Sequence, residues 1–122
     1  MAKTVMIVDD SASLRQVVSI ALRGAGYEVI EGCDGKDALS KLTGQKVHLV
    51  ISDINMPNMD GITFVKNLKL MPAYKFTPVI MLTTESQEAK KQEAQAAGAK
   101  AWVIKPFYPA QMLEAVAKLI MP

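Results

Sequence analysis

The chain of 122 residues is poor in the residues that mark secreted, membrane or nucleic-acid-binding proteins. It contains one cysteine, Cys33, so no internal disulfide can form and a reducing compartment fits the sequence. We find no apolar stretch long enough to cross a bilayer and no apolar segment typical of a signal peptide. Basic residues do not gather in a run that would indicate a nucleic acid or membrane surface. We therefore expect a cytoplasmic protein that binds neither membranes nor nucleic acid.

The composition favours one folded domain. Hydrophobic residues make up 50% of the chain and the formal net charge is only +2, so disorder is not expected. A chain of this length can bury a core without disulfides or a structural metal. We predict a single domain over residues 1–122, with no second domain to carry an output, and a monomer.

Five short apolar runs have the composition of strands, and a helical pattern follows each of them. The run at Leu49–Ile51 leads directly into Asp53, and unbroken Val, Ile and Leu runs are typical of strands that are covered on both faces. Strict alternation of strands and helices predicts a parallel sheet with helices on both faces. The fold class is thus α/β, as a flavodoxin-like doubly wound sheet of strand order 2-1-3-4-5. The predicted strands are residues 4–8, 28–31, 49–53, 79–82 and 101–104.

The helices are predicted from apolar spacing and from capping residues. Apolar residues three and four apart define the buried face of the first helix. Thr84 and Gln87 have the spacing of a capping box for a fourth helix that runs to Gly98. Its apolar residues are all alanine, so we expect this helix to be held weakly. We also expect Cys33 to fill a small apolar space. The expected buried face of the first helix is Leu14, Val17, Val18, Ala21, Leu22 and Ala25.

Charged and polar side chains follow four of the five predicted strands. In the proposed order the first and third strands are neighbours, so Asp9, Asp10 and Asp53 converge at one edge. Two unit charges about 4 Å apart repel by about 4 kcal/mol at an effective dielectric near 20, so compensation is needed. Lys105 supplies one positive charge, and Mg²⁺, which prefers oxygen ligands, supplies two. A carboxylate beside Mg²⁺ can act as a nucleophile toward phosphorus, with Thr83 and Lys105 holding the transferred group.

These motifs together resemble the receiver domains of two-component response regulators. The resemblance rests on Asp9-Asp10, on the stretch from Ser52 through Asp53 to Gly61, on Thr83, and on Lys105-Pro106. It covers the whole chain and is nearest to the single-domain chemotaxis members, the CheY type.

The resemblance implies a role for each of these residues. Asp53 would be the phosphoacceptor, and the Mg²⁺ ligands would be Asp53, Asp10 directly, Asp9 mainly through water, and Asn55 through its backbone carbonyl. Lys105 would pair with the phosphoryl oxygens, and the Lys105–Pro106 bond would be cis. Thr83 would move toward the phosphoryl group and Trp102 would swing inward behind it. Asn55 and Glu85 would lie beside the phosphoryl site and influence hydrolysis.

The implied function is a phosphorylation-activated switch and not an enzyme, although such a switch assists its own phosphorylation and dephosphorylation. A CheA-like histidine kinase would donate the phosphoryl group. The target would be a protein, with the flagellar motor switch as the family expectation, contacted by the fourth helix, fifth strand and fifth helix.

Other interpretations of the same residues stay open. An Asp at a strand end is often only a helix cap, Thr83 could be an ordinary strand-end hydroxyl, and Trp102 could simply fill the core. A Mg²⁺-dependent phosphatase with an aspartyl nucleophile is the alternative function, although Asn55 stands where such enzymes need a second Asp. A flavin or dinucleotide carrier is disfavoured, because no glycine-rich phosphate loop occurs in the sequence.

Overall fold

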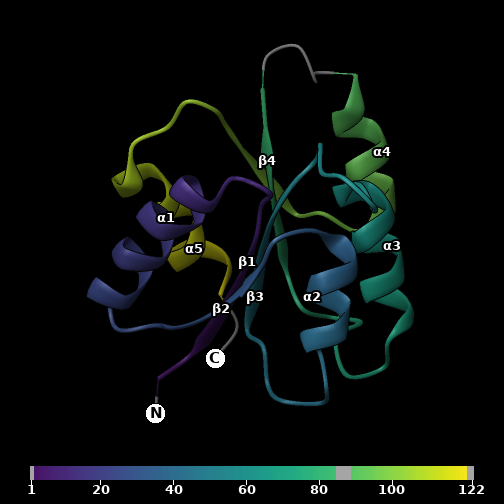
Figure 1. Ribbon diagram of the computed structural model, residues 1–122, viewed down its shortest axis with the longest axis horizontal. Coiled ribbons are helices and arrows are strands. Elements are labelled where there is room, and N and C mark those ends of the chain that lie inside the picture. Colours follow the sequence, from purple (N-terminus) through teal and green to yellow (C-terminus); the bar gives the residue numbers. More distant parts are fainter. Residues whose placement is uncertain (1, 85–88, 121–122) are drawn as a thin grey trace.

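The five strands form one parallel sheet. A computed structural model of the chain describes residues 2–84 and 89–120. The strand order is β2-β1-β3-β4-β5, and every neighbouring pair is parallel (Figure 1). The predicted α/β fold and strand order are therefore confirmed. The strands are β1 (Thr4–Val8), β2 (Glu28–Gly32), β3 (Leu49–Asp53), β4 (Val79–Thr83) and β5 (Ala101–Ile104).

The helices cover both faces of this sheet. Figure 1 shows α1 and α5 on one side of the sheet and α2, α3 and α4 on the other. No helix among residues 2–84 and 89–120 has the length and apolar character needed to cross a membrane. The helices are α1 (Ala12–Gly24), α2 (Gly35–Lys41), α3 (Gly61–Leu70), α4 (Lys90–Ala97) and α5 (Pro109–Leu119).

Each face of the sheet has its own apolar core, because side chains alternate along a strand. In β1, Val5 and Ile7 pack on the side of α1 and α5, whereas Met6 and Val8 pack on the side of α2 and α3. Every residue of β3 and β4 is buried, as the unbroken apolar runs predict. These two central strands are therefore a rigid base for the polar groups at their ends.

Three of the helices that begin at the carboxyl edge of the sheet are each capped by a side chain from the preceding loop. The Leu14 amide donates to Ser11 Oγ at 3.2 Å. Asp34 Oδ1 accepts from the Asp37 amide at 2.7 Å, and Asp60 Oδ1 accepts from the Thr63 amide at 2.8 Å. Such caps each contribute about 1 kcal/mol and fix where the helices begin and the loops around the edge end.

Two expectations drawn from the sequence are wrong. Val17 is 52% exposed, because it lies at the margin of the apolar stripe, and only Val18 and Leu22 of that stripe are fully buried. Cys33 is exposed in the turn between β2 and α2. Helix α4, described over Lys90–Ala97, buries only Ala94 in that range, in agreement with the weak packing expected from its alanines. The predicted capping partner of Thr84, Gln87, lies outside the described residues.

Candidate functional site

Three carboxylates meet where β1 and β3 end. Val8 is in register with Ser52, so the following residues, Asp9 and Asp53, come to the same edge. Asp9, Asp10 and Asp53 each offer an oxygen, and these three oxygens all lie within 4.8 Å of one another. Asp9 is fully buried and Asp53 nearly so, whereas Asp10 is exposed. The convergence expected from the strand order is therefore present in the structure.

The Asp53 carboxyl group is held in a way that raises its proton affinity. Burial, and then the charge of Asp9, raise the pKa of Asp53 to about 6, against the opposing effect of Lys105. Its Oδ1 accepts a hydrogen bond from the Ile54 amide at 2.9 Å. Asp53 therefore carries a charge at neutral pH, but this charge is held in an unfavourable environment.

Lys105 links the two buried carboxylates. Its Nζ lies 3.1 Å from Asp9 Oδ2 and 3.3 Å from Asp53 Oδ2, and its peptide bond to Pro106 is cis. Burial alone would lower the pKa of Lys105, but the neighbouring carboxylates, Asp53 first, raise it. The ammonium group is thus a fixed positive charge beside Asp53.

One ammonium group does not neutralise three carboxylates, and this imbalance suits a divalent cation. Both oxygens of Asp9 already accept hydrogen bonds, Oδ1 from the Ser11 amide at 2.8 Å and Oδ2 from Lys105. The exposed Asp10 carboxylate offers further oxygens, and Asp53, which accepts from the Ile54 amide at Oδ1 and faces Lys105 at Oδ2, keeps further lone pairs on both oxygens. Mg²⁺ takes few carboxylates and keeps several water ligands. The chemistry of this donor set therefore fits Mg²⁺.

Thr83 ends β4 beside this cluster with an unsatisfied hydroxyl. The residue is fully buried, and its Oγ1 has no hydrogen-bond partner among the residues that the structure describes. An unpaired buried hydroxyl costs about 1–3 kcal/mol, so it is available to a group that enters the site.

The other predicted residues lie around the site. Asn55 is exposed in the loop between β3 and α3, and Trp102 is partly buried on the edge strand β5. Because Trp102 is in register with Met81, it lies on the same sheet face as Thr83, one strand away. Glu85 lies outside the described residues.

The sequence interpretation missed Arg15, a residue of α1 that contacts the backbone of Asp9. Its Nη1 donates to the Asp9 backbone carbonyl at 2.6 Å, and its Nε lies 3.3 Å from Glu31 Oε1. Side chains on a helix tilt toward its amino end, so a basic residue one turn after Ser11 could have indicated this contact.

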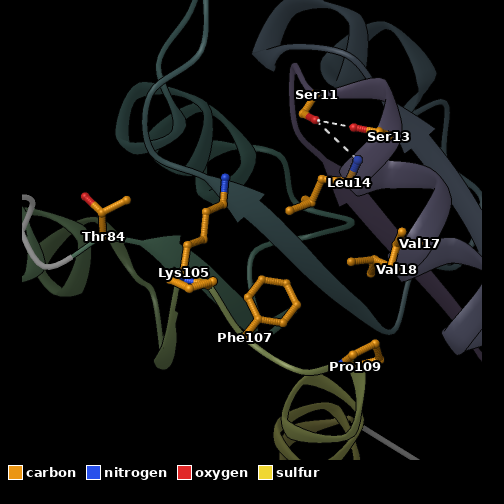
Figure 2. Close-up of a pocket in the computed structure, with 10 residues that line it drawn as sticks. Ser11, Ser13, Leu14, Val17, Val18, Thr84, Lys105, Phe107 and Pro109 are labelled. Carbon is orange, nitrogen blue, oxygen red and sulfur yellow. Dashed lines mark hydrogen bonds between the residues drawn. The ribbon is translucent and has the colours of Figure 1, made fainter.

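A pocket opens beside Lys105, between α1 and the segment that follows β5. It has a volume of about 590 Å³. Figure 2 shows the Lys105 side chain and the Phe107 ring along it, with the Ser11 hydroxyl bonded to Ser13 and to the Leu14 amide. The lining is mostly apolar and includes Val17, so an apolar surface adjoins the acidic cluster.

Fold and site together define a receiver domain, and comparison with known proteins agrees. Residues 5–117 match the family model of the response regulator receiver domain, so the chain belongs to this family. Receiver domains of this type are phosphorylation-activated signalling switches, not classical enzymes, and they bind Mg²⁺ at an acidic pocket.

The relatives narrow the class to chemotaxis proteins. Chemotaxis protein CheY of Thermotoga maritima is 39% identical over 98% of both chains. Chemotaxis protein CheY-3 of Vibrio cholerae is 35% identical over 94% of this chain and 89% of its own. The solved structure of Vibrio cholerae CheY4 superimposes with a TM-score of 0.92 at 46% identity, over 98% of this chain and 100% of its own. The chain is thus similar to CheY proteins over nearly its full length.

Proposed function

We propose that Asp53 is the phosphoacceptor of a chemotaxis-type pathway, and that it receives its phosphoryl group from a CheA-like histidine kinase in the presence of Mg²⁺. The observation that carries this proposal is the position of Asp53, which is nearly buried between two further carboxylates and 3.3 Å from the Lys105 ammonium. An aspartate that only caps a helix would need neither the repulsion of two neighbouring carboxylates nor the partly buried Lys105 ammonium group.

In the proposed reaction a carboxylate oxygen of Asp53 attacks phosphorus. The new O–P bond forms as the P–N bond to the donor imidazole breaks, and the bonding electrons return to that nitrogen. Lys105 stabilises the phosphoryl oxygens by charge, and the unpaired Thr83 hydroxyl donates to one of them. The same site would later lose the phosphoryl group to water.

Asp10, Asp53 and the Asn55 backbone carbonyl are the proposed Mg²⁺ ligands, with Asp9 acting through water. Asp10 is exposed, whereas Asp9 is fully buried and both of its oxygens accept from Ser11 and Lys105, which supports direct binding by Asp10 and binding through water by Asp9. When bound, the ion supplies the positive charge that the carboxylates and the phosphoryl oxygens share.

The proposed signal is a change in protein contacts at α4, β5 and α5, in a cytoplasmic monomer. Helix α4 is weakly packed, with only Ala94 buried, and weakly packed elements change conformation at the lowest cost. Ile104, at the end of β5, and Tyr108, at the N-cap of α5, are 42% and 78% exposed and offer apolar area suited to a protein target. The relatives' chemotaxis names make the flagellar motor switch the target to test first.

Counting released phosphate tests this proposal against a phosphatase. The protein is incubated with Mg²⁺ and excess small-molecule phosphodonor, and free phosphate is followed from the first turnover. We expect one phosphoryl group per chain at early times, and none bound by Asp53→Asn. Rapid release over many cycles, with no modified protein at any time, would support a phosphatase.

A further inference from the structure

Beyond the phosphoacceptor site, a hydrogen bond joins two loops that flank the acidic edge. Asn58 Nδ2 donates to Asp34 Oδ2 at 2.8 Å, although the two residues are 24 positions apart. Asp34 caps α2 after β2, and Asn58 lies in the loop that leads from Asp53 to α3. The acidic cluster itself contains neither residue.

The Asp34 carboxylate is fully engaged by these two contacts. Its Oδ1 accepts from the Asp37 amide at 2.7 Å, while Oδ2 accepts from Asn58, and the side chain is buried. The Asp37 amide first, and the Asn58 amide second, hold the pKa of Asp34 below its ordinary value. The acceptor is therefore charged at neutral pH, and a charged acceptor strengthens the hydrogen bond.

Asn58 also adopts an uncommon backbone conformation. Its φ is +67°, in the left-handed region where asparagine, aspartate and glycine are best tolerated. Next to it, Met59 packs against Gly35 so closely that a Cβ at Gly35 would lie 2.9 Å from Met59 Sδ. The tip of the loop after Asp53 thus rests on the start of α2 through one polar and one apolar contact.

The base of the same loop is closed independently. The Gly61 amide donates to the Ile54 carbonyl at 2.7 Å, and a Cβ at Gly61 would overlap the Asp53 carbonyl oxygen. Between this base and the Asn58 contact lies Asn55. With both ends of the loop held, the direction of the Asn55 backbone carbonyl is restricted.

We propose that the Asp34–Asn58 hydrogen bond positions the Asn55 carbonyl for Mg²⁺, so that Asp34 and Asn58 are positioning residues for the site. This inference rests on the proposed function, because it concerns the ligand set suggested there. Groups that orient metal ligands typically change metal affinity by 10–100-fold when they are removed.

Substitutions at the two residues test the proposal, with the Mg²⁺ dissociation constant of each variant measured by calorimetric titration. Asn58→Asp keeps a residue that tolerates φ +67° but places two carboxylates face to face, and we expect the dissociation constant to rise roughly tenfold. The double variant Asp34→Asn/Asn58→Asp restores one donor and one acceptor, retains a good cap for α2, and should recover the original affinity. The charge of Asn58→Asp by itself would predict tighter binding, so positioning and simple electrostatics predict opposite signs.

Two controls keep the result interpretable. Asp37→Asn removes one acidic charge from the start of α2 without touching the Asp34–Asn58 bond, because its side chain contacts Cys33 and Lys41, so it should bind Mg²⁺ as the parent does. Asn58→Gly relieves the backbone strain and removes the donor, so it should fold and still bind Mg²⁺ roughly tenfold more weakly.

Amide hydrogen exchange gives a readout that needs no metal. Without Mg²⁺, the amides of residues 55, 56, 58 and 59 should exchange about fivefold faster in Asn58→Asp, as loss of a hydrogen bond of ordinary strength predicts. Unchanged or tighter Mg²⁺ binding by Asn58→Asp, or no recovery in the double variant, would overturn the positioning role. Absence of Mg²⁺ binding by the parent protein would instead contradict the proposed function.

Discussion

Lys105 and Asp53 form an ion pair at the carboxyl edge of the sheet, with Nζ 3.3 Å from Oδ2. The same ammonium group also pairs with Asp9 at 3.1 Å, so each carboxylate receives only a share of its charge. Burial first, and the charge of Asp9 second, raise the pKa of Asp53 to about 6 against the opposing effect of this cation. The free site is therefore electrostatically strained, and this strain has measurable consequences.

Asp53→Asn should stabilise the metal-free protein. The Asp53 pKa is about 6 in the fold and near 3.8 ordinarily, so between these values the native state holds the proton more tightly than the unfolded chain. The parent's free energy of unfolding therefore falls as pH rises from about 4 to 6, whereas that of the variant lacks this decrease. At pH 7.5 we expect a gain of about 1–2 kcal/mol, allowing for solvent screening at the rim.

Urea unfolding at pH 4 and pH 7.5, both without Mg²⁺, measures this difference. Asp60→Asn is the matched control, because Asp60 caps α3 from an exposed position and asparagine caps equally well. A gain for Asp53→Asn that is the same at both pH values would show that charge is not its cause.

Mg²⁺ affinity should depend on pH through the same group. Below pH 6 the Asp53 carboxyl group must lose a proton before it can serve as a ligand, so binding of Mg²⁺ releases up to one proton. We expect the apparent dissociation constant at pH 5 to be about tenfold higher than at pH 7.5. Calorimetry in buffers of different ionisation enthalpy measures both the affinity and the proton count. No proton release at pH 5 would contradict this assignment.

Replacement of Thr83 by valine should stabilise the metal-free protein. Valine removes a buried hydroxyl that has no hydrogen-bond partner within residues 2–84 and 89–120, so the metal-free fold should gain about 1 kcal/mol. Thr77→Val is the matched control, because Thr77 is also buried but its Oγ1 donates to the Val47 carbonyl at 3.4 Å, so this variant should lose about 1 kcal/mol. If Thr83→Val is destabilised as much as Thr77→Val, the Thr83 hydroxyl of the parent protein has a hydrogen-bond partner in solution.

Trp102 provides an optical readout, because it is the only tryptophan in the sequence. It lies on the same sheet face as Thr83, one strand away, and packs against the core beside α4. Addition of Mg²⁺ and then a beryllofluoride phosphoryl mimic should change its fluorescence, and Thr83→Val should reduce that change. An unchanged spectrum in the parent, with binding of the mimic verified separately, would remove Trp102 from the switch.

The sequence predicted the features that depend on local pattern and failed where long-range packing decides. Continuous apolar runs and their polar ends were sufficient for the sheet order and for the convergence of Asp9 with Asp53. Val17 was misplaced because helical spacing defines a stripe but not its margin. Arg15 was missed because its partners become visible only once α1 is packed against the sheet.

The loops between strands and helices also contain contacts that the sequence alone does not predict. Asp34 and Asn58 each belong to an ordinary turn, and nothing in either turn indicates a hydrogen bond between them. Cys33 was expected to be buried because cysteine usually is, but it falls in the exposed turn after β2. Composition indicates the average environment of a residue type, whereas the topology decides the individual position.

The most direct test of the phosphoacceptor assignment is mass spectrometry of the protein after reaction with a small-molecule phosphodonor, with and without Mg²⁺. We predict one added phosphoryl group per chain, dependent on Mg²⁺ and mapped to Asp53. It should be absent from Asp53→Asn and retained in Asp37→Asn, a control carboxylate on α2. A phosphoryl group on any other residue, or equal modification after Mg²⁺ is removed, would contradict the assignment.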